Sequence, residues 1–215
     1  MNIDKKKWQA DELRAVRRSA AFPTREMAAL TFDHDDRANK YITNIAHRYV
    51  DNFCVLRTMP DNNGLILYGG VGTGKTYIAA CIVNALIDNG YDCYFTNFSR
   101  LVNHISGMYQ GKQEFIDSLN KYELLVIDDL AAERETDYTH EIIFNVIDTR
   151  CNSRKPLIIT TNLTAEQLKN PDTEKKRRIY SRLLERCTPV EVHGADRRKA
   201  KLKENYKVIS DMLGI

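Results

Sequence analysis

The sequence predicts an α/β protein with a five-stranded parallel sheet that is covered by helices on both faces. Strand-length apolar segments alternate with helix-like segments along the chain, and this alternation is typical of parallel sheets. Five of the ten glycines fall between residues 64 and 74, at a turn between one predicted strand and one predicted helix. A length of 215 residues fits one sizeable domain with an appendage.

Composition predicts a compact, soluble protein. Hydrophobic residues make up 43% of the chain and charged residues 28%. The longest aliphatic stretches, such as residues 124–127, are strand-sized, so we expect neither a signal peptide nor contact with a membrane. The five cysteines are widely separated and contain no CxxC pair. We therefore expect a cytoplasmic protein with reduced thiols that pack as small buried apolar side chains.

Net charge is +3, which is too small to indicate nucleic-acid binding by itself, but the basic residues are unevenly distributed. Residues 174–204 hold eleven Lys or Arg against five Asp or Glu, and residues 1–30 hold seven against four. Two interpretations stay open for these ends: solvated helix faces, or contacts with phosphates.

The first predicted strand, residues 64–69, leads into a glycine-rich turn and a long helix that closes near Gly90. Gly69, Gly74, Lys75 and Thr76 match the pattern GxxxxGK[ST]. In this pattern backbone N–H groups surround phosphate oxygens, the lysine reaches the β and γ phosphates, and the hydroxyl holds Mg²⁺. An ordinary glycine turn is the alternative. The predicted nucleotide-binding residues are Gly69, Gly70, Val71, Gly72, Thr73, Gly74, Lys75, Thr76 and Tyr77.

The second predicted strand, residues 92–97, precedes a predicted helix over residues 98–110. Leu101, Val102, Ile105, Met108 and Tyr109 would share one face of this helix, most simply as part of the core.

The third predicted strand, residues 123–129, has the sequence ELLVIDD, so its aliphatic part is buried and its carboxylates emerge at the carboxyl end of the sheet. We assign Asp128 to Mg²⁺, directly or through water, and Asp129 to activation of the attacking water. Because Asp129 is one methylene shorter than glutamate, Glu133 is an alternative base, and a surface carboxylate is the simpler interpretation of Glu133.

The fourth predicted strand, residues 156–162, ends in Asn162 at the same edge of the sheet. Asn162 would orient the lytic water or contact the γ-phosphate, or else be a turn residue or the N-cap of a helix that begins near Thr164. The fifth strand is predicted over residues 189–193, between helices over 175–186 and 196–213. The NKxD tetrad that recognises guanine is absent, which favours adenine.

The segments GLILYGGVGTGKT, LLVIDDLAAE, LIITTNL and RIYSRLLERC, in this order and spacing, resemble the DnaC/IstB-type AAA+ ATPases over about residues 32–203. The resemblance implies a P-loop NTPase of the AAA+ type, a three-layer sandwich with strand order 5-1-4-3-2. Because the chain after Arg182 is short, we expect no full C-terminal lid. We expect an N-terminal helical extension over residues 1–31, which is a candidate partner-binding segment, and an AAA+ ATPase domain over residues 32–215.

The family pattern places Walker A at residues 69–76, Walker B at Asp128 and Asp129, sensor I at Asn162 and the arginine finger at Arg182. In this interpretation Arg182 acts on the ATP site of an adjacent subunit, whereas the alternative is a surface salt bridge. Arg197 and Arg198 lie near the expected position of a second sensor, without an assigned role.

The resemblance also implies ATP, Mg²⁺ and three kinds of partner: single-stranded DNA, a replicative helicase of the DnaB type, and further copies of the chain through the ATP site. Arg100, Lys112 and Lys121, on the helical element after the second strand, are the DNA-contacting candidates. We expect an ATP-hydrolysing helicase loader. The alternatives are an IstB-like transposition helper, a nucleotide-dependent scaffold with little hydrolysis, and a small-molecule phosphotransferase.

Overall fold

The computed structural model describes residues 3–35, 39–131 and 136–213. The elements, in chain order, are α1 (Ile3–Ala21), α2 (Arg25–Ala28), η1 (Phe32–His34), α3 (Lys40–Asp51), α4 (Phe53–Leu56), β1 (Gly64–Tyr68), α5 (Lys75–Asp88), β2 (Cys93–Asn97), α6 (Phe98–Ser106), α7 (Lys112–Ser118), η2 (Leu119–Lys121), β3 (Leu124–Leu130), α8 (Asp137–Asn152), β4 (Leu157–Thr161), α9 (Ala165–Lys169), α10 (Glu174–Arg186), β5 (Cys187–Glu191) and α11 (Arg197–Leu213).

Five parallel strands form one sheet in the order β2-β3-β4-β1-β5, which is the predicted order 5-1-4-3-2 counted from the other edge. The five expected strands are all present, each within two residues of its expected ends. The central strands β3 and β4 consist mostly of buried aliphatic residues, as strands covered on both faces require. Strand β5 carries Pro189 and lies at an edge, where a missing N–H costs no pairing.

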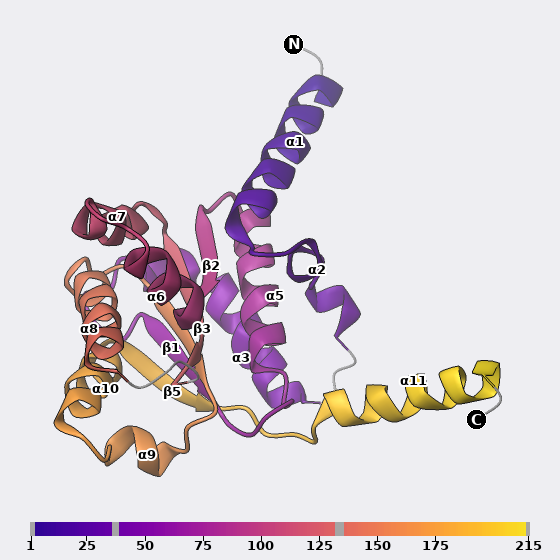
Figure 1. The fold of residues 1–215 in the computed structure, drawn as a ribbon. Helices are drawn as coiled ribbons and strands as arrows, with labels where there is room; N and C mark the ends of the chain where they lie inside the picture. The colour runs from indigo at the N-terminus through magenta and orange to yellow at the C-terminus, as the bar shows by residue number, and fades with distance from the viewer. Residues whose placement is uncertain (1–2, 36–38, 132–135, 214–215) are drawn as a thin grey trace.

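Helices cover both faces of the sheet and complete the three layers (Figure 1). One core cluster joins alternate strand residues such as Leu124 and Val126 to α3, α5 and the end of α1. The other joins Leu125 and Ile127 to α6, α7, α8 and α10. The alternation of neighbouring residues between the two clusters follows the period of two in a strand. The predicted fold class is therefore confirmed.

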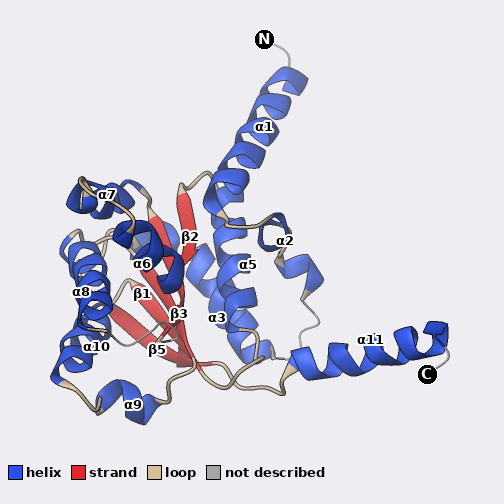
Figure 2. Cartoon of the chain, viewed as in Figure 1, coloured by secondary structure: helices blue, strands red, loops and turns tan. Residues whose placement is uncertain are grey.

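Helices α1 and α11 project from this body in different directions, as Figure 2 shows. The last turns of α1 contact α5 and β2, and Ala21 is buried there. The boundary that we placed between residues 31 and 32 stays a prediction. In the part of the chain that the structure describes, no helix has both the length and the apolar character to span a bilayer.

Two expectations about local structure are wrong. The helix expected over residues 98–110 ends at Ser106, and Gly107 is its C-cap, so Met108 and Tyr109 are not on its apolar face. Tyr109 is fully exposed, whereas Leu101 and Ile105 are buried as expected. Four cysteines are buried, and burial raises the pKa of their thiols, but Cys54 on α4 is exposed.

Candidate nucleotide-binding site

The loop between β1 and α5 adopts a backbone conformation that favours glycine at three positions, Gly69, Gly72 and Gly74. Gly69 has φ 145°, and a Cβ added there would lie 2.6 Å from the carbonyl oxygen of Val192. Gly74 has φ 98° and is the N-cap of α5, and a Cβ there would meet nothing within 4 Å. The loop therefore presents its backbone at the start of a 14-residue helix, an arrangement that suits phosphate groups.

The Lys75 ammonium lies across the mouth of this loop. The residue is 6% exposed, and its ammonium donates to the carbonyl oxygens of Gly69 at 2.9 Å and Gly70 at 2.8 Å, and to Oδ1 of Asn162 at 2.8 Å. Burial lowers the pKa of Lys75, while the carboxylates of Asp129 and Asp128 act in the opposite direction. Lys75 thus connects the phosphate loop to the end of β4.

Asn162 is not the N-cap that one interpretation suggested. Thr164 caps α9 and forms a capping box with Gln167. The amide of Asn162 is turned instead toward Lys75, so the structure places it beside the phosphate loop.

The side chains of Asp128 and Thr76 lie together behind the loop, and both carry oxygen atoms that can bind a metal. The Thr76 hydroxyl lies 3.0 and 3.1 Å from the two carboxylate oxygens of Asp128, and the Thr160 hydroxyl also donates to Asp128. Asp128 is 7% exposed. Burial raises its pKa, while the hydrogen bonds from Thr160 and Thr76 act in the opposite direction. A hydroxyl and a carboxylate at this spacing are the oxygen ligands that Mg²⁺ prefers, so these residues fit the metal.

A β-bulge separates the two carboxylates. The register of β3 against β4 shifts between Ile127 and Leu130, so that Asp128 and Asp129 both lie opposite Thr160. Asp129 has φ 58°, and its N–H donates to the Thr160 hydroxyl at 3.0 Å. Its side chain is exposed and lines the pocket above the loop, whereas Asp128 is buried against Thr76. Bulges commonly re-aim side chains next to active sites. Glu133, the alternative base, lies outside the described residues.

A pocket of about 400 Å³ lies above the phosphate loop. Its lining comes from the loop and α5, the ends of β3 and β4, the segment after α2, and the start of α11: Leu30, Val71, Gly72, Gly74, Lys75, Thr76, Tyr77, Asp129, Asn162, Arg197 and Arg198. The volume lies in the range of small-molecule sites. Asp129 and Asn162 form its polar part together with Lys75, and Leu30 and Tyr77 form an apolar part.

The sequence interpretation did not identify Leu30, and it gave Arg197 no role. Leu30 lies 45 residues before Lys75 in sequence, and no motif marks it. Arg197 begins α11, and its backbone N–H donates to the carbonyl oxygen of Gly72 at 3.2 Å. The preceding Asp196 lies against Gly72, where an added Cβ would sit 1.9 Å from its carboxylate oxygen. The only feature of the sequence that could have pointed to this side of the pocket was the basic pair Arg197 and Arg198 at the predicted start of the last helix.

Arg182 is not among the residues that line this pocket. It lies on α10, which packs against α8, and its guanidinium pairs with Asp148 at 2.9 Å and with Glu185 at 3.1 Å. Within one chain, Arg182 therefore makes the surface ion pairs of the alternative interpretation. A role at the ATP site would be on a neighbouring subunit.

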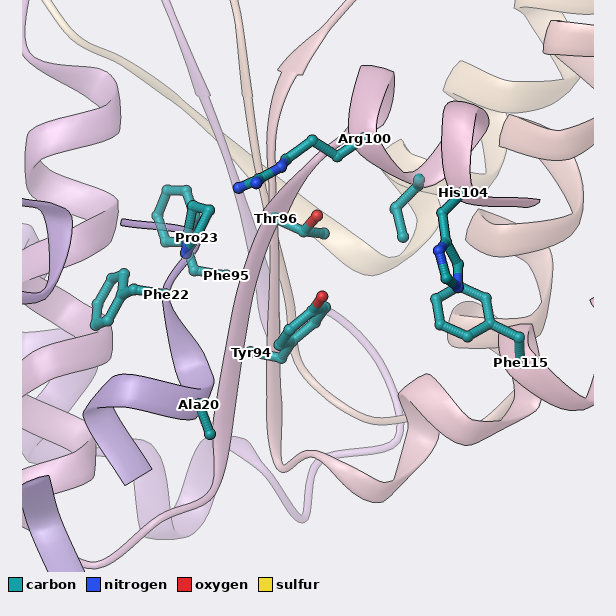
Figure 3. Close-up of a pocket in the computed structure, with 10 residues that line it drawn as sticks. Ala20, Phe22, Pro23, Tyr94, Phe95, Thr96, Arg100, His104 and Phe115 are labelled. Carbon is teal, nitrogen blue, oxygen red and sulfur yellow. The ribbon is translucent and has the colours of Figure 1, made fainter. Parts of the chain in front are cut away.

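The three DNA-contacting candidates lie near aromatic side chains. Arg100 lines a second pocket, of about 350 Å³, beside the edge strand β2 (Figure 3). Lys112 donates to the Tyr138 hydroxyl at 2.7 Å. The Lys121 ammonium lies 4.9 Å from the centre of the Tyr122 ring, which stacks on Tyr94. Basic and aromatic side chains also occur together in sites for single-stranded nucleic acid.

The family model described as IstB-like ATP binding protein matches residues 5–205. A Mycobacterium tuberculosis protein, named as an ATP-binding protein in an insertion sequence, is 30% identical over 156 residues, which are 68% of this chain and 61% of that protein. The replicative helicase loader DnaI of Bacillus subtilis is 27% identical over 147 residues, 63% of this chain and 47% of the loader. The chain thus spans about half to three fifths of the length of these relatives.

A solved structure of the DnaC helicase loader is similar in fold. It superposes with a TM-score of 0.62 at 24% identity, and the match covers 79% of this chain and all of that chain.

Proposed function

The chain belongs to the family of IstB-like ATP-binding proteins, and we propose that it is a Mg²⁺-dependent ATPase that helps to load a replicative helicase onto single-stranded DNA. The ATPase proposal rests on one observation: site residues that are far apart in the sequence meet at one pocket. Lys75 on α5, Asp129 on β3 and Asn162 directly after β4 line one pocket, with Thr76 and Asp128 paired behind it.

Each residue would have a separate task in hydrolysis. Thr76 and Asp128 would hold Mg²⁺, which when bound neutralises charge on the phosphates. Lys75 would exchange its carbonyl partners for phosphate oxygens, a charge-assisted contact that is stronger than the contacts it replaces. Asp129 is the exposed carboxylate at the pocket and would accept a proton from the attacking water, and Asn162 would orient that water.

The helicase-loading part of the proposal draws on the relatives. DnaI and DnaC are named as replicative helicase loaders and match more than half of this chain. Three cations on α6, α7 and η2 lie near aromatic rings, which supports contact with single-stranded DNA. They are Arg100, Lys112 and Lys121. Residues 1–31 are the proposed helicase-binding segment, and Arg182 is the proposed contact between copies.

A transposition helper is the second candidate. The insertion-sequence relative and the family model support it as well as the DnaI and DnaC relatives support the loader. A scaffold that binds ATP and hydrolyses it slowly is the third. The short side chain of Asp129 is the observation that favours it.

One set of measurements tests these candidates. Steady-state ATP turnover is measured with and without single-stranded DNA, and co-purification is measured against the replicative helicase and against a transposase of the same genome. Turnover stimulated by DNA together with helicase binding would support the loader. Transposase binding alone would support the helper, and nucleotide binding with negligible turnover would support the scaffold. Failure to bind Mg²⁺-ATP would refute all three.

A further inference from the structure

Leu30 lies on the apolar side of the pocket above the phosphate loop, and two side chains of α5 are hydrogen-bonded to the segment that carries it. The Tyr77 hydroxyl donates to the carbonyl oxygen of Thr31 at 2.8 Å, and the Asn84 amide donates to the carbonyl oxygen of Leu30 at 2.8 Å. The Leu30 side chain lines the pocket. The segment that carries Leu30 is therefore hydrogen-bonded to α5, the same helix that begins in the phosphate loop.

Asn84 is 1% exposed, and both ends of its amide have partners. Its Nδ2 donates to Leu30 and also to the carbonyl oxygen of Ala80 at 3.2 Å, while its Oδ1 accepts from Nε of Arg18 at 3.1 Å. A buried amide is costly unless its polar atoms are hydrogen-bonded. Arg18 therefore completes the set of bonds that keeps the Asn84 amide oriented toward Leu30.

Arg18 belongs to α1, the helix that we propose as part of a partner-binding segment. Its guanidinium also pairs with Asp88 at the end of α5. The neighbouring Arg17 donates to the carbonyl oxygen of Gly90 at 2.8 Å and pairs with Asp92 at 2.8 Å. Figure 1 shows the last turns of α1 beside α5, while the rest of α1 projects away from the body. A continuous set of contacts thus runs from α1 through Asn84 to the pocket.

We propose that Asn84 is a positioning residue for the nucleotide base and that Arg18 connects α1 to it, so that lifting α1 from α5 weakens ATP binding. This inference rests on the proposed function, because it requires ATP in this pocket. The phosphate loop holds the triphosphate, so the base must lie along the remaining wall. Leu30 and Tyr77 supply the apolar surface that a base would cover there.

The test compares two ligands in several variants. Dissociation constants of Mg²⁺-ATP and of Mg²⁺-tripolyphosphate are measured by isothermal titration calorimetry, with circular dichroism as the check of folding. Arg18→Met removes the donor to Asn84 and keeps an unbranched apolar stem. Asn84→Asp keeps an acceptor for Arg18, but an ionised carboxylate cannot donate to Leu30.

Two matched controls separate this contact from general effects on α1. Asp88→Asn removes the ion pair of Arg18 and leaves its bond to Asn84 in place. Arg14→Met removes a cation of α1 whose ion pair, with Asp11, lies within the same helix.

We expect Arg18→Met and Asn84→Asp to raise the dissociation constant of ATP about three- to tenfold, the effect of one lost hydrogen bond. Tripolyphosphate should bind unchanged, because it uses the phosphate loop alone, and both controls should match the wild type. If Asn84→Asp does not fold, Arg18→Met alone decides the outcome.

Three results would overturn the inference while the proposed function stands: unchanged ATP affinity in Arg18→Met, equal weakening of both ligands, or an Asp88→Asn protein that behaves like Arg18→Met. A wild-type protein that binds neither ligand would overturn the proposed function and the inference together.

Discussion

Replacing Arg182 by alanine should reduce ATP turnover in the assembled protein by at least about 30-fold. An arginine finger supplied in trans is worth about 10³ to 10⁵ in rate, or about 4–7 kcal/mol. To act there, Arg182 must give up its ion pairs with Asp148 and Glu185. The three side chains are 39%, 26% and 56% exposed, so each pair contributes at most about 1 kcal/mol and both together at most about 2. The gain exceeds this cost by at least about 2 kcal/mol.

The assay is a mixing experiment. Arg182→Ala has an intact phosphate loop and Lys75→Ala has an intact finger, so the mixture should recover part of the activity that each protein lacks alone. Turnover per subunit of the wild type should also rise with protein concentration. Specific activity that stays constant over a wide concentration range, with Arg182→Ala equal to the wild type, would refute the trans-acting role and leave Arg182 as a surface ion pair.

Four further predictions concern the site and its partners. Burial raises the pKa of Asp128, so the stability that this group contributes is present at acid pH and is lost as pH rises through the folded-state pKa. Without nucleotide, Asp128→Asn should therefore unfold at a temperature no lower than the wild type at pH 7, with the difference shrinking toward pH 4, and it should lose the thermal stabilisation by Mg²⁺-ATP. Asp129→Asn should keep nucleotide binding and lose hydrolysis, and equal loss of binding in both variants would contradict the division of roles. Lys75→Ala should lose more than about tenfold in ATP binding or turnover, and undiminished activity of the pure variant would exclude the phosphate-loop assignment. Binding of single-stranded DNA, measured by fluorescence anisotropy with an ATP analogue present, should weaken steeply as salt rises and should weaken in Arg100→Ala; no binding at low salt would leave only protein partners.

The sequence predicted the sheet well because its signals are local. Strands β1, β3 and β4 each contain a short aliphatic run, and the phosphate loop is a contiguous motif in which Gly69, Gly72 and Gly74 have the positive φ that favours glycine. The strand order came with the family resemblance, since local patterns do not specify which parallel strands are neighbours. The helix after β2 was predicted too long because an apolar period continued past Gly107, where the helix ends.

The parts of the pocket that sequence reasoning missed depend on tertiary contacts. Leu30 reaches the pocket because a buried amide on α5 holds its carbonyl group, and nothing in the residues around Leu30 indicates that partner. Likewise, the two carboxylates of β3 were correctly expected at the carboxyl end of the sheet. Their separation into a buried and an exposed side chain, however, depends on a bulge against β4. Such a register shift arises between strands and is not visible in either strand alone.

The attachment of α11 to the phosphate loop has a mechanical consequence. The helix begins with a hydrogen bond from Arg197 to Gly72 and then extends away from the body over 17 residues, or about 26 Å at about 1.5 Å per residue. A rotation of about 10° at its first turn would displace its far end by about 4–5 Å, as follows from that length. A small rotation at the phosphate loop would therefore be amplified into a displacement of several ångströms at the outer end of α11.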